Sequence, residues 1–238
     1  MVFFLLGLCC EFIDSHLGGG YGTILTPVFL IMGYSPLQII PCILITEIFT
    51  GFISGGIYHK FGYVASKSSI VIFITASVGA ILGSSLLISI SKFYVSLYIG
   101  ILVIILGIMM LMNYKIKYSI KSTGLLGVLL GFNKALTGGG FGPVAVAGLS
   151  IFGLDSKKAI GTTLLAEGLV CSTALILLLF RNVQILLDIL LPLLLGAIIG
   201  GVIGSIRTVK YESKAKLQML VSIFIIILGC SILFNCYK

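Results

Sequence analysis

Gly18-Gly19-Gly20-Tyr21-Gly22 interrupts the first apolar run of this chain, and Gly138-Gly139-Gly140-Phe141-Gly142 interrupts another run 120 residues later. Each glycine costs a helix roughly 1 kcal/mol relative to alanine, so adjacent glycines end it. The arms beside the two breaks are too short to cross a bilayer and predict buried or re-entrant segments. They cover residues 2–14 and 22–32 in the first copy and 122–134 and 142–152 in the second.

The composition places the chain in a lipid bilayer. Of its 238 residues, 59% are hydrophobic and 9% are charged, and the mean hydropathy is +1.25, which predicts a polytopic membrane protein. The net charge of +8 lies in short breaks between apolar runs, where membrane proteins carry topology signals, so it does not indicate a nucleic-acid partner. The six cysteines show no spacing typical of a metal site or of disulfides. No metal and no cofactor are expected.

Six longer apolar runs can each form a membrane-spanning helix. They cover residues 37–59, 68–90, 93–113, 158–180, 183–206 and 217–235. The first run of the chain has neither a basic segment before it nor a small-residue cleavage site, so it is not predicted to be a signal peptide. The predicted fold class is an all-α polytopic membrane protein.

The chain contains an internal repeat. Residues 5–47 align with residues 125–167 without a gap, and 13 of the 43 positions are identical. Roughly four identities would be expected by chance in so Leu-, Ile- and Gly-rich a chain, which indicates duplication. The predicted units of this one membrane domain are 1–113 and 122–238, joined by a basic cytoplasmic linker over 114–121.

The distribution of positive charge indicates how the two units are oriented. If each glycine-broken segment crosses the membrane, the 14 Lys and Arg residues outside the arms divide seven to seven. If each segment is a hairpin that enters and leaves on one side, the same residues divide 11 to 3, as the positive-inside rule requires. We therefore predict two inverted-topology repeats, each with one re-entrant hairpin and three spans. The basic loops are then cytoplasmic and both termini lie outside. A broken helix that spans the membrane is the alternative.

Two hairpins that enter from opposite faces bring their glycine tips together near the midplane, where transporters bind their substrates. The arms that begin there present free N–H groups and positive dipole ends, which attract anions. The candidate substrate-binding residues are Gly18, Gly19, Gly20, Tyr21, Gly22, Thr23, Lys134, Thr137, Gly138, Gly139, Gly140, Phe141 and Gly142. The structural alternative is that the glycines only let helices cross.

Ionisable residues at bilayer depth are the remaining candidates, because buried charge is costly and usually functional. Glu47 and Glu167 are equivalent in the two repeats and fall near mid-bilayer, where either can carry a proton or simply bond a neighbouring helix as a protonated acid. Asp14 and Lys134 are also equivalent but opposite in charge, so they can pair with each other. Alternatively, Lys134 attracts an anion and Asp14 caps its hairpin. His16 is close enough to the first tip to be a ligand or proton carrier.

These motifs resemble the TauE/SafE family of anion exporters. The resemblance rests on Phe12-Ile13-Asp14-Ser15, the glycine stretch with Thr23, Pro27 and Gly33-Tyr34-Ser35-Pro36 in the first half. In the second half it rests on Thr137 with its glycine stretch, Pro143 and Lys158-Ala159-Ile160-Gly161-Thr162-Thr163. The resemblance implies a carrier in the cell membrane for a small anionic substrate, namely sulfite or an organosulfonate. It leaves the oligomeric state open, a homodimer included.

Other functions fit the residues less well. A cation or divalent-metal carrier that uses Glu47, Glu167 and Asp14 is the main alternative, but Lys134 and two helix N-termini oppose a cation. A potassium filter would need a fourfold ring of identical loops, whereas the two glycine stretches here differ at Tyr21 and Phe141. An enzyme is not predicted, because neither a zinc-protease motif nor a nucleophile triad can be recognised.

Overall fold

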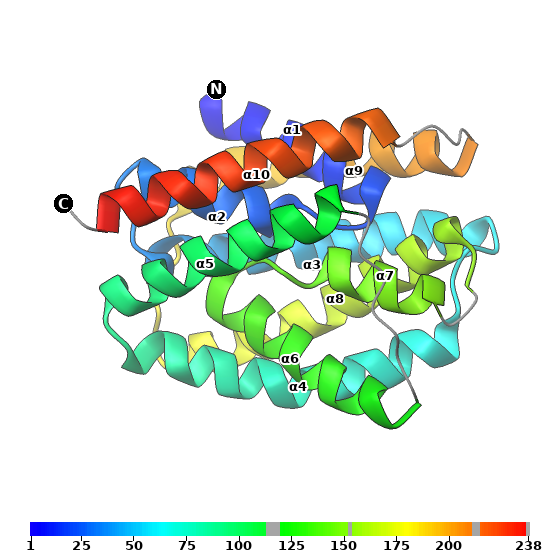
Figure 1. Cartoon of the computed structure of the whole chain (residues 1–238), viewed down its shortest axis with the longest axis horizontal. Helices are drawn as coiled ribbons and strands as arrows, with labels where there is room; N and C mark the ends of the chain where they lie inside the picture. The colour runs from blue at the N-terminus through cyan, green and yellow to red at the C-terminus, as the bar shows by residue number, and fades with distance from the viewer. Residues whose placement is uncertain (113–119, 152–153, 211–214, 237–238) are drawn as a thin grey trace.

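The structure is a computed structural model that describes residues 1–112, 120–151, 154–210 and 215–236. These ranges form ten helices (Figure 1): α1 (Val2–Leu17), α2 (Tyr21–Ile31), α3 (Pro36–Lys60), α4 (Ser66–Ser89), α5 (Lys92–Leu111), α6 (Ile120–Thr137), α7 (Gly142–Ile151), α8 (Ser156–Phe180), α9 (Leu187–Lys210) and α10 (Ala215–Cys236). Most of the predicted linker, residues 114–119, lies outside the described residues. So do residues 113 and 152 and the basic residues Lys115, Lys117, Lys214 and Lys238.

The two glycine stretches end helices as predicted. α1 continues three residues beyond the predicted arm and stops at Gly18, whose φ of 83° is left-handed and favours glycine. The N–H groups of Gly18 and Gly19 both donate to the Asp14 carbonyl, at 2.6 and 3.1 Å. α6 likewise runs to Thr137 and is followed by Gly138 with a φ of 74°. The helices therefore end only where the first glycine permits the chain to turn.

Polar residues mark the starts of the two longest helices. Before α3, the Ser35 N–H donates to Gln38 Oε1 at 2.8 Å and the Ser35 side chain accepts the Gln38 N–H, which together make a capping box. Pro36 takes the first helical position. Before α8, the Asp155 carboxylate accepts the Lys157 N–H at 3.1 Å. Both helices thus begin at residues whose side chains satisfy the free N–H groups of a first turn.

Five helices are long and apolar enough to cross a membrane: α3, α4, α5, α8 and α9. They correspond to five of the six predicted spans, and α10 covers the sixth. α9 begins at Leu187, four residues later than predicted, because Asn182 adopts a φ of 54° and the chain turns before the helix starts. The protein is therefore a multi-pass, all-helical membrane protein.

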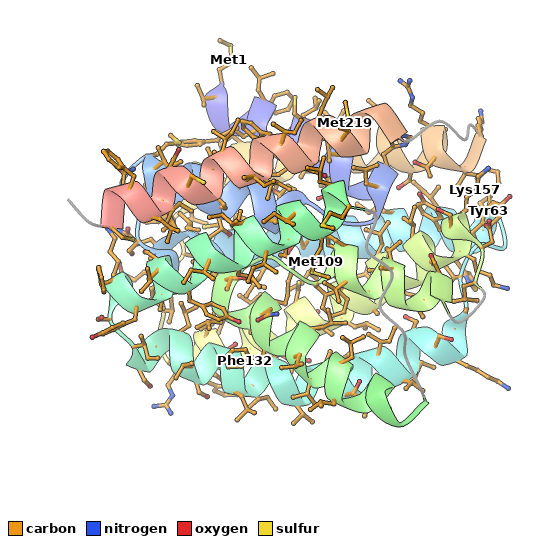
Figure 2. All side chains as sticks on the ribbon, viewed as in Figure 1. Met1, Tyr63, Met109, Phe132, Lys157 and Met219 are labelled. Carbon is orange, nitrogen blue, oxygen red and sulfur yellow. The ribbon has the colours of Figure 1, made fainter. Side chains whose placement is uncertain are left out.

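The outer surface suits a lipid environment. Figure 2 shows mostly carbon along the outward faces, whereas Lys157 lies at one end of the molecule beside Tyr63. On α4, large apolar side chains such as Ile74 and Leu82 are about half exposed, and on α9 Leu195 is equally exposed. Lipid tails can cover such faces, while the charged ends reach the headgroups.

Pairs of helices join the two repeats. α1 packs along α9 and α6 packs along α4, which are equivalent contacts if the repeats exchange places. Both contacts depend on glycine: a Cβ on Gly7 would lie 2.2 Å from the Leu193 carbonyl oxygen, and one on Gly79 would lie 1.8 Å from that of Val128. The equivalent helices α3 and α8 pack on each other, as do α5 and α10. The contacts therefore follow a pseudo-twofold pattern.

The first glycine-broken segment folds back on itself. Near the start of α1, the Phe3 ring contacts the Phe29 ring near the end of α2, with centroids 5.8 Å apart. The two arms are therefore antiparallel, as in a hairpin. How the repeats lie relative to a bilayer stays a prediction.

Candidate functional site

The two glycine tips lie against each other in the interior. A Cβ on Gly22 would lie 1.6 Å from the Gly138 carbonyl oxygen, and one on Gly142 would lie 2.4 Å from the Gly19 Cα. The two backbones are therefore in direct contact, and any larger residue at these positions would push the tips apart. The glycines at the crossing are needed for this close approach as well as for ending the helices.

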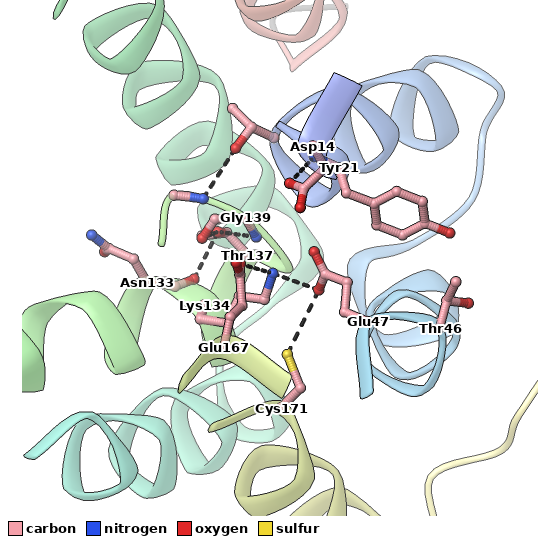
Figure 3. A network of polar contacts seen from close by, with 12 residues as sticks. Asp14, Tyr21, Thr46, Glu47, Asn133, Lys134, Thr137, Gly139, Glu167 and Cys171 are labelled. Carbon is pink, nitrogen blue, oxygen red and sulfur yellow. Dashed lines mark hydrogen bonds and ion pairs between the residues drawn. The ribbon is translucent and has the colours of Figure 1, made fainter. Parts of the chain in front are cut away.

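Protein side chains accept the N–H groups at both tips. The Tyr21 N–H donates to Asp14 Oδ1 at 2.9 Å (Figure 3). At the other tip, the Gly139 N–H donates to Thr137 Oγ1 at 3.1 Å and the Gly140 N–H donates to Thr23 Oγ1, also at 3.1 Å. These N–H groups, predicted to face an anion, are thus already paired in this conformation.

An ion-pair triad lies beside the crossed tips. Lys134 Nζ, from α6, is 2.5 Å from Glu47 Oε2 on α3 and 2.7 Å from Glu167 Oε1 on α8 (Figure 3). All three side chains are almost completely buried, with the Lys134 side chain only 1% exposed. The two equivalent glutamates thus converge on the cation predicted to attract an anion. The hypothesis that Lys134 pairs with Asp14 is wrong, because the glutamates hold Lys134 while Asp14 caps α2.

A narrow cavity adjoins the triad. It is lined by Glu11, Asp14, Glu47, Thr50, Gly51, Leu164 and Glu167 and has no room for a water-sized sphere. Three carboxyl oxygens of this lining, Glu11 Oε2, Glu47 Oε1 and Glu167 Oε2, have no hydrogen-bond partner among the described residues. The site is therefore closed, with spare acceptor capacity on its acidic side.

Comparison with known proteins identifies the family. The chain matches the family model described as Sulfite exporter TauE/SafE over residues 3–232. The chain belongs to the sulfite exporter TauE/SafE family. It is also similar to the "Probable membrane transporter protein YtnM" of Bacillus subtilis (strain 168), with 32% identity over 174 residues. That match covers 68% of this chain and 58% of the length of YtnM. No solved structure matches the chain.

Membership of the TauE/SafE family confirms the resemblance carried by the glycine motifs. The family is one of membrane transport proteins and not of enzymes. Within the described residues, no group of three or more His, Cys, Asp and Glu side chains is arranged to hold a metal ion.

His16 lies apart from the triad of this TauE/SafE protein. Its Nδ1 is 2.6 Å from Thr208 Oγ1 on α9, and its ring stacks on Phe12 with centroids 5.9 Å apart. It is not one of the residues that line the cavity. The structure therefore brings Glu47, Glu167, Asp14 and Lys134 together but places His16 on the α9 side of α1.

Sequence reasoning did not assign Thr50 or Cys171 to the site. Thr50 lines the cavity one turn after Glu47, and Cys171 lies one turn after Glu167, where its thiol donates to Glu47 Oε2 at 3.7 Å. A spacing of three or four residues from a buried glutamate on the same helix face was the available signal. No comparable sequence pattern predicted the close contact of Gly51 with Gly168, where α3 crosses α8.

Proposed function

We propose that this protein is a secondary transporter that moves a small sulfur oxyanion, sulfite or an organosulfonate, by alternating access coupled to protons. The observation that carries the proposal is the position of Lys134, held between two equivalent glutamates next to the crossed glycine tips. The family match supports the substrate class, because the family is described as sulfite exporters.

Lys134 is the anion-binding group of the proposed site. It is the one lysine or arginine among the described residues that is buried, so it is the only full positive charge available there for an anion. In the closed conformation, Glu47 and Glu167 occupy its donors. An oxyanion that enters between the tips accepts hydrogen bonds from the Lys134 ammonium in place of the glutamates. It also accepts hydrogen bonds from the N–H groups of the two helix starts.

Proton binding and anion binding are linked at this site. Two carboxylates and one ammonium leave a net charge of −1 if both acids are ionised, so an anion is repelled until an acid is neutralised. Protonation of Glu47 or Glu167 weakens its hold on Lys134 and frees the ammonium for the substrate. By reciprocity, a bound anion favours protonation of the same carboxyl group.

The membrane orientation is part of the proposal. The 11 to 3 division of basic residues places the loops after α3 and α9 in the cytoplasm and both termini outside. The hairpin formed by α1 and α2 would then open from the outside, and the segment of α6 and α7 from the cytoplasm. Separation of the tips on one side at a time would expose Lys134 to each compartment in turn.

Flux of radiolabelled sulfite in proteoliposomes, with and without a pH gradient, tests the function. We expect gradient-dependent flux in the wild type and its loss in Glu47→Gln and in Glu167→Gln. Asp188→Asn, which changes an exposed acid at the start of α9, should transport normally.

Two results would contradict the proposal. Absence of sulfite and sulfoacetate flux, together with flux of a divalent cation, would show that the carboxylates bind cations. Sulfite flux that is insensitive to the gradient and to both glutamine variants would remove the proton coupling.

A further inference from the structure

A buried chain of polar groups leads away from the triad cavity along α1 and α3. The Ser15 hydroxyl donates to Glu11 Oε1 at 3.1 Å and lies 3.0 Å from the Ser54 hydroxyl. Because the Ser15 proton points to Glu11, Ser54 is the donor in the second bond. All three side chains are buried, with Glu11 1% exposed and the two serines fully covered. The hydroxyl protons are therefore aligned toward the Glu11 carboxylate.

A second group of buried polar side chains lies toward the ends of α3 and α9. One turn after Ser54, the Tyr58 hydroxyl donates to the Ser15 carbonyl at 2.9 Å and lies beside the Thr208 hydroxyl. Thr208 Oγ1 in turn is 2.6 Å from His16 Nδ1. Thr208 is buried but directly follows Arg207, which is exposed. Because the Tyr58 hydroxyl donates to a backbone carbonyl, Tyr58, Thr208 and His16 form a separate group of polar contacts beyond the two serines.

The polar residues that α1 and α3 contribute have no polar counterparts at the equivalent positions of the second repeat. α3 and α8 correspond residue for residue at the offset of 120, and both have 25 residues. The positions equivalent to Glu11, Ser15, Thr50, Ser54 and Tyr58 are occupied by Gly131, Ala135, Val170, Ala174 and Leu178. The last four of these are equally buried, but they carry no polar side-chain atom. Buried polar side chains are costly in a membrane protein, so their restriction to one repeat indicates a function.

The geometry points to a proton relay from Ser54 through Ser15 to Glu11, on the side of the triad toward the ends of α3 and α9. The inference rests on the proposed proton-coupled transport and assigns the route of the proton. An incoming proton binds the Ser54 hydroxyl, which passes its own proton to Ser15. Ser15 then passes a proton to Glu11 Oε1. Each hydroxyl gains one proton and loses one, so only the Glu11 carboxylate changes charge.

Glu11 connects the path to the transport site. It lines the same cavity as Glu47 and Thr50, and its Oε2 has no partner among the described residues, so it can pass the proton on. The titratable and charged groups around it come from each neighbouring helix: Cys10 and Asp14 on α1, Tyr21 on α2, Glu47 on α3 and Glu167 on α8. α9 presents Gly201, whose Cβ would lie 3.3 Å from Glu11 Cγ.

The buried polar residues of α3 extend over much of the distance to its end. From Glu47 to Tyr58, α3 rises about 16 Å at 1.5 Å per residue, which is about half of a hydrocarbon core of about 30 Å. Ser54 and Ser15 thus lie on the side of the closed site toward the basic end. At the equivalent positions, the second repeat has alanines.

The double variant Ser15→Ala/Ser54→Ala tests the path, since it gives the first repeat the alanines of the second. We expect sulfite flux driven by a pH gradient to fall about tenfold or more, because proton transfer steps depend on positioned groups to this extent. Exchange of labelled for unlabelled sulfite at equal pH should be unchanged, because the carrier can return with its proton bound.

Ser84→Ala is the matched control. The Ser84 hydroxyl, on α4, is also buried and donates to the carbonyl of Ala174, the residue equivalent to Ser54. Gradient-driven flux at the wild-type level in Ser15→Ala/Ser54→Ala would overturn the path. Equal loss of exchange and gradient-driven flux would also overturn it, because the serines would then only support the fold. If the wild type itself transports no sulfur oxyanion, the proposed function fails and not the path alone.

Discussion

Replacement of Lys134 by methionine should destabilise the protein strongly. The variant keeps the length of the side chain but leaves Glu47 and Glu167, now 2.5 and 2.7 Å from the lysine nitrogen, without their common cation. Removing one partner of a buried ion pair costs about 3–5 kcal/mol. For a chain of this size, about 2–4 °C is lost per kcal/mol, so we expect the melting temperature to fall by about 6–20 °C.

Thermal unfolding in detergent, followed with a thiol-reactive dye, measures this effect because the buried Cys10 and Cys171 become reactive only on unfolding. The triple variant Lys134→Met/Glu47→Gln/Glu167→Gln should recover most of the loss, since no unpaired charge remains. Melting of Lys134→Met at the wild-type temperature would show that the triad does not hold the helices together. A triple variant as unstable as the single one would show that packing, and not charge, causes the loss.

Two further predictions concern the tips and the topology. Gly139→Leu should insert into membranes but abolish transport, because a Cβ there would lie 2.7 Å from the Thr23 nitrogen. Gly56→Leu, with nothing within 4 Å of its Cβ, should transport normally. Sulfite flux in proteoliposomes would measure both variants, and an active Gly139→Leu would refute the need for close tips. With the exposed native cysteines replaced by serine, a membrane-impermeant maleimide should label Lys92→Cys but not Lys60→Cys in intact cells, and the reverse pattern would refute the predicted orientation.

The elements of the fold could be predicted from the sequence because each depends on local chemistry. Consecutive glycines end helices whatever surrounds them, and apolar runs of about 20 residues form membrane-spanning helices by their length alone. The repeat could be recognised because its identities fall on glycines at helix crossings and on Glu47 and Glu167. These positions are constrained by contacts that occur in both halves.

The partners within the site could not be predicted in the same way. Alignment of the repeats shows which residues are equivalent, but it does not give their distances from the pseudo-twofold axis. Asp14 and Lys134 are equivalent and opposite in charge, which made a pair between them plausible. The glutamates are instead close enough for both to reach Lys134. The polar residues that follow Glu47 on α3 were visible in the sequence, but their buried, one-sided placement required the helix packing.

The different roles of Asp14 and Lys134 follow from how each tip pairs its N–H groups. In the first tip, the residue just before the glycines is Leu17, which has no side-chain acceptor, so the Asp14 carboxylate accepts the Tyr21 N–H. In the second tip, the equivalent of Leu17 is Thr137, whose hydroxyl accepts the Gly139 N–H. The two acceptors bind different N–H groups, because Gly139 is equivalent to Gly19 and not to Tyr21. A buried N–H without an acceptor is costly, so these side chains stabilise the tips.

In the second tip, threonines and not residue 134 accept the N–H groups of Gly139 and Gly140. A lysine in place of Asp14 would leave the first tip without its acceptor and would place a second cation near the start of α2, where the helix dipole disfavours it. Because Thr137 and Thr23 accept these N–H groups, none of the bonds uses position 134, and its lysine reaches the two glutamates instead. The repeats thus differ at one pair of positions, where Asp14 holds a helix start and Lys134 holds two carboxylates.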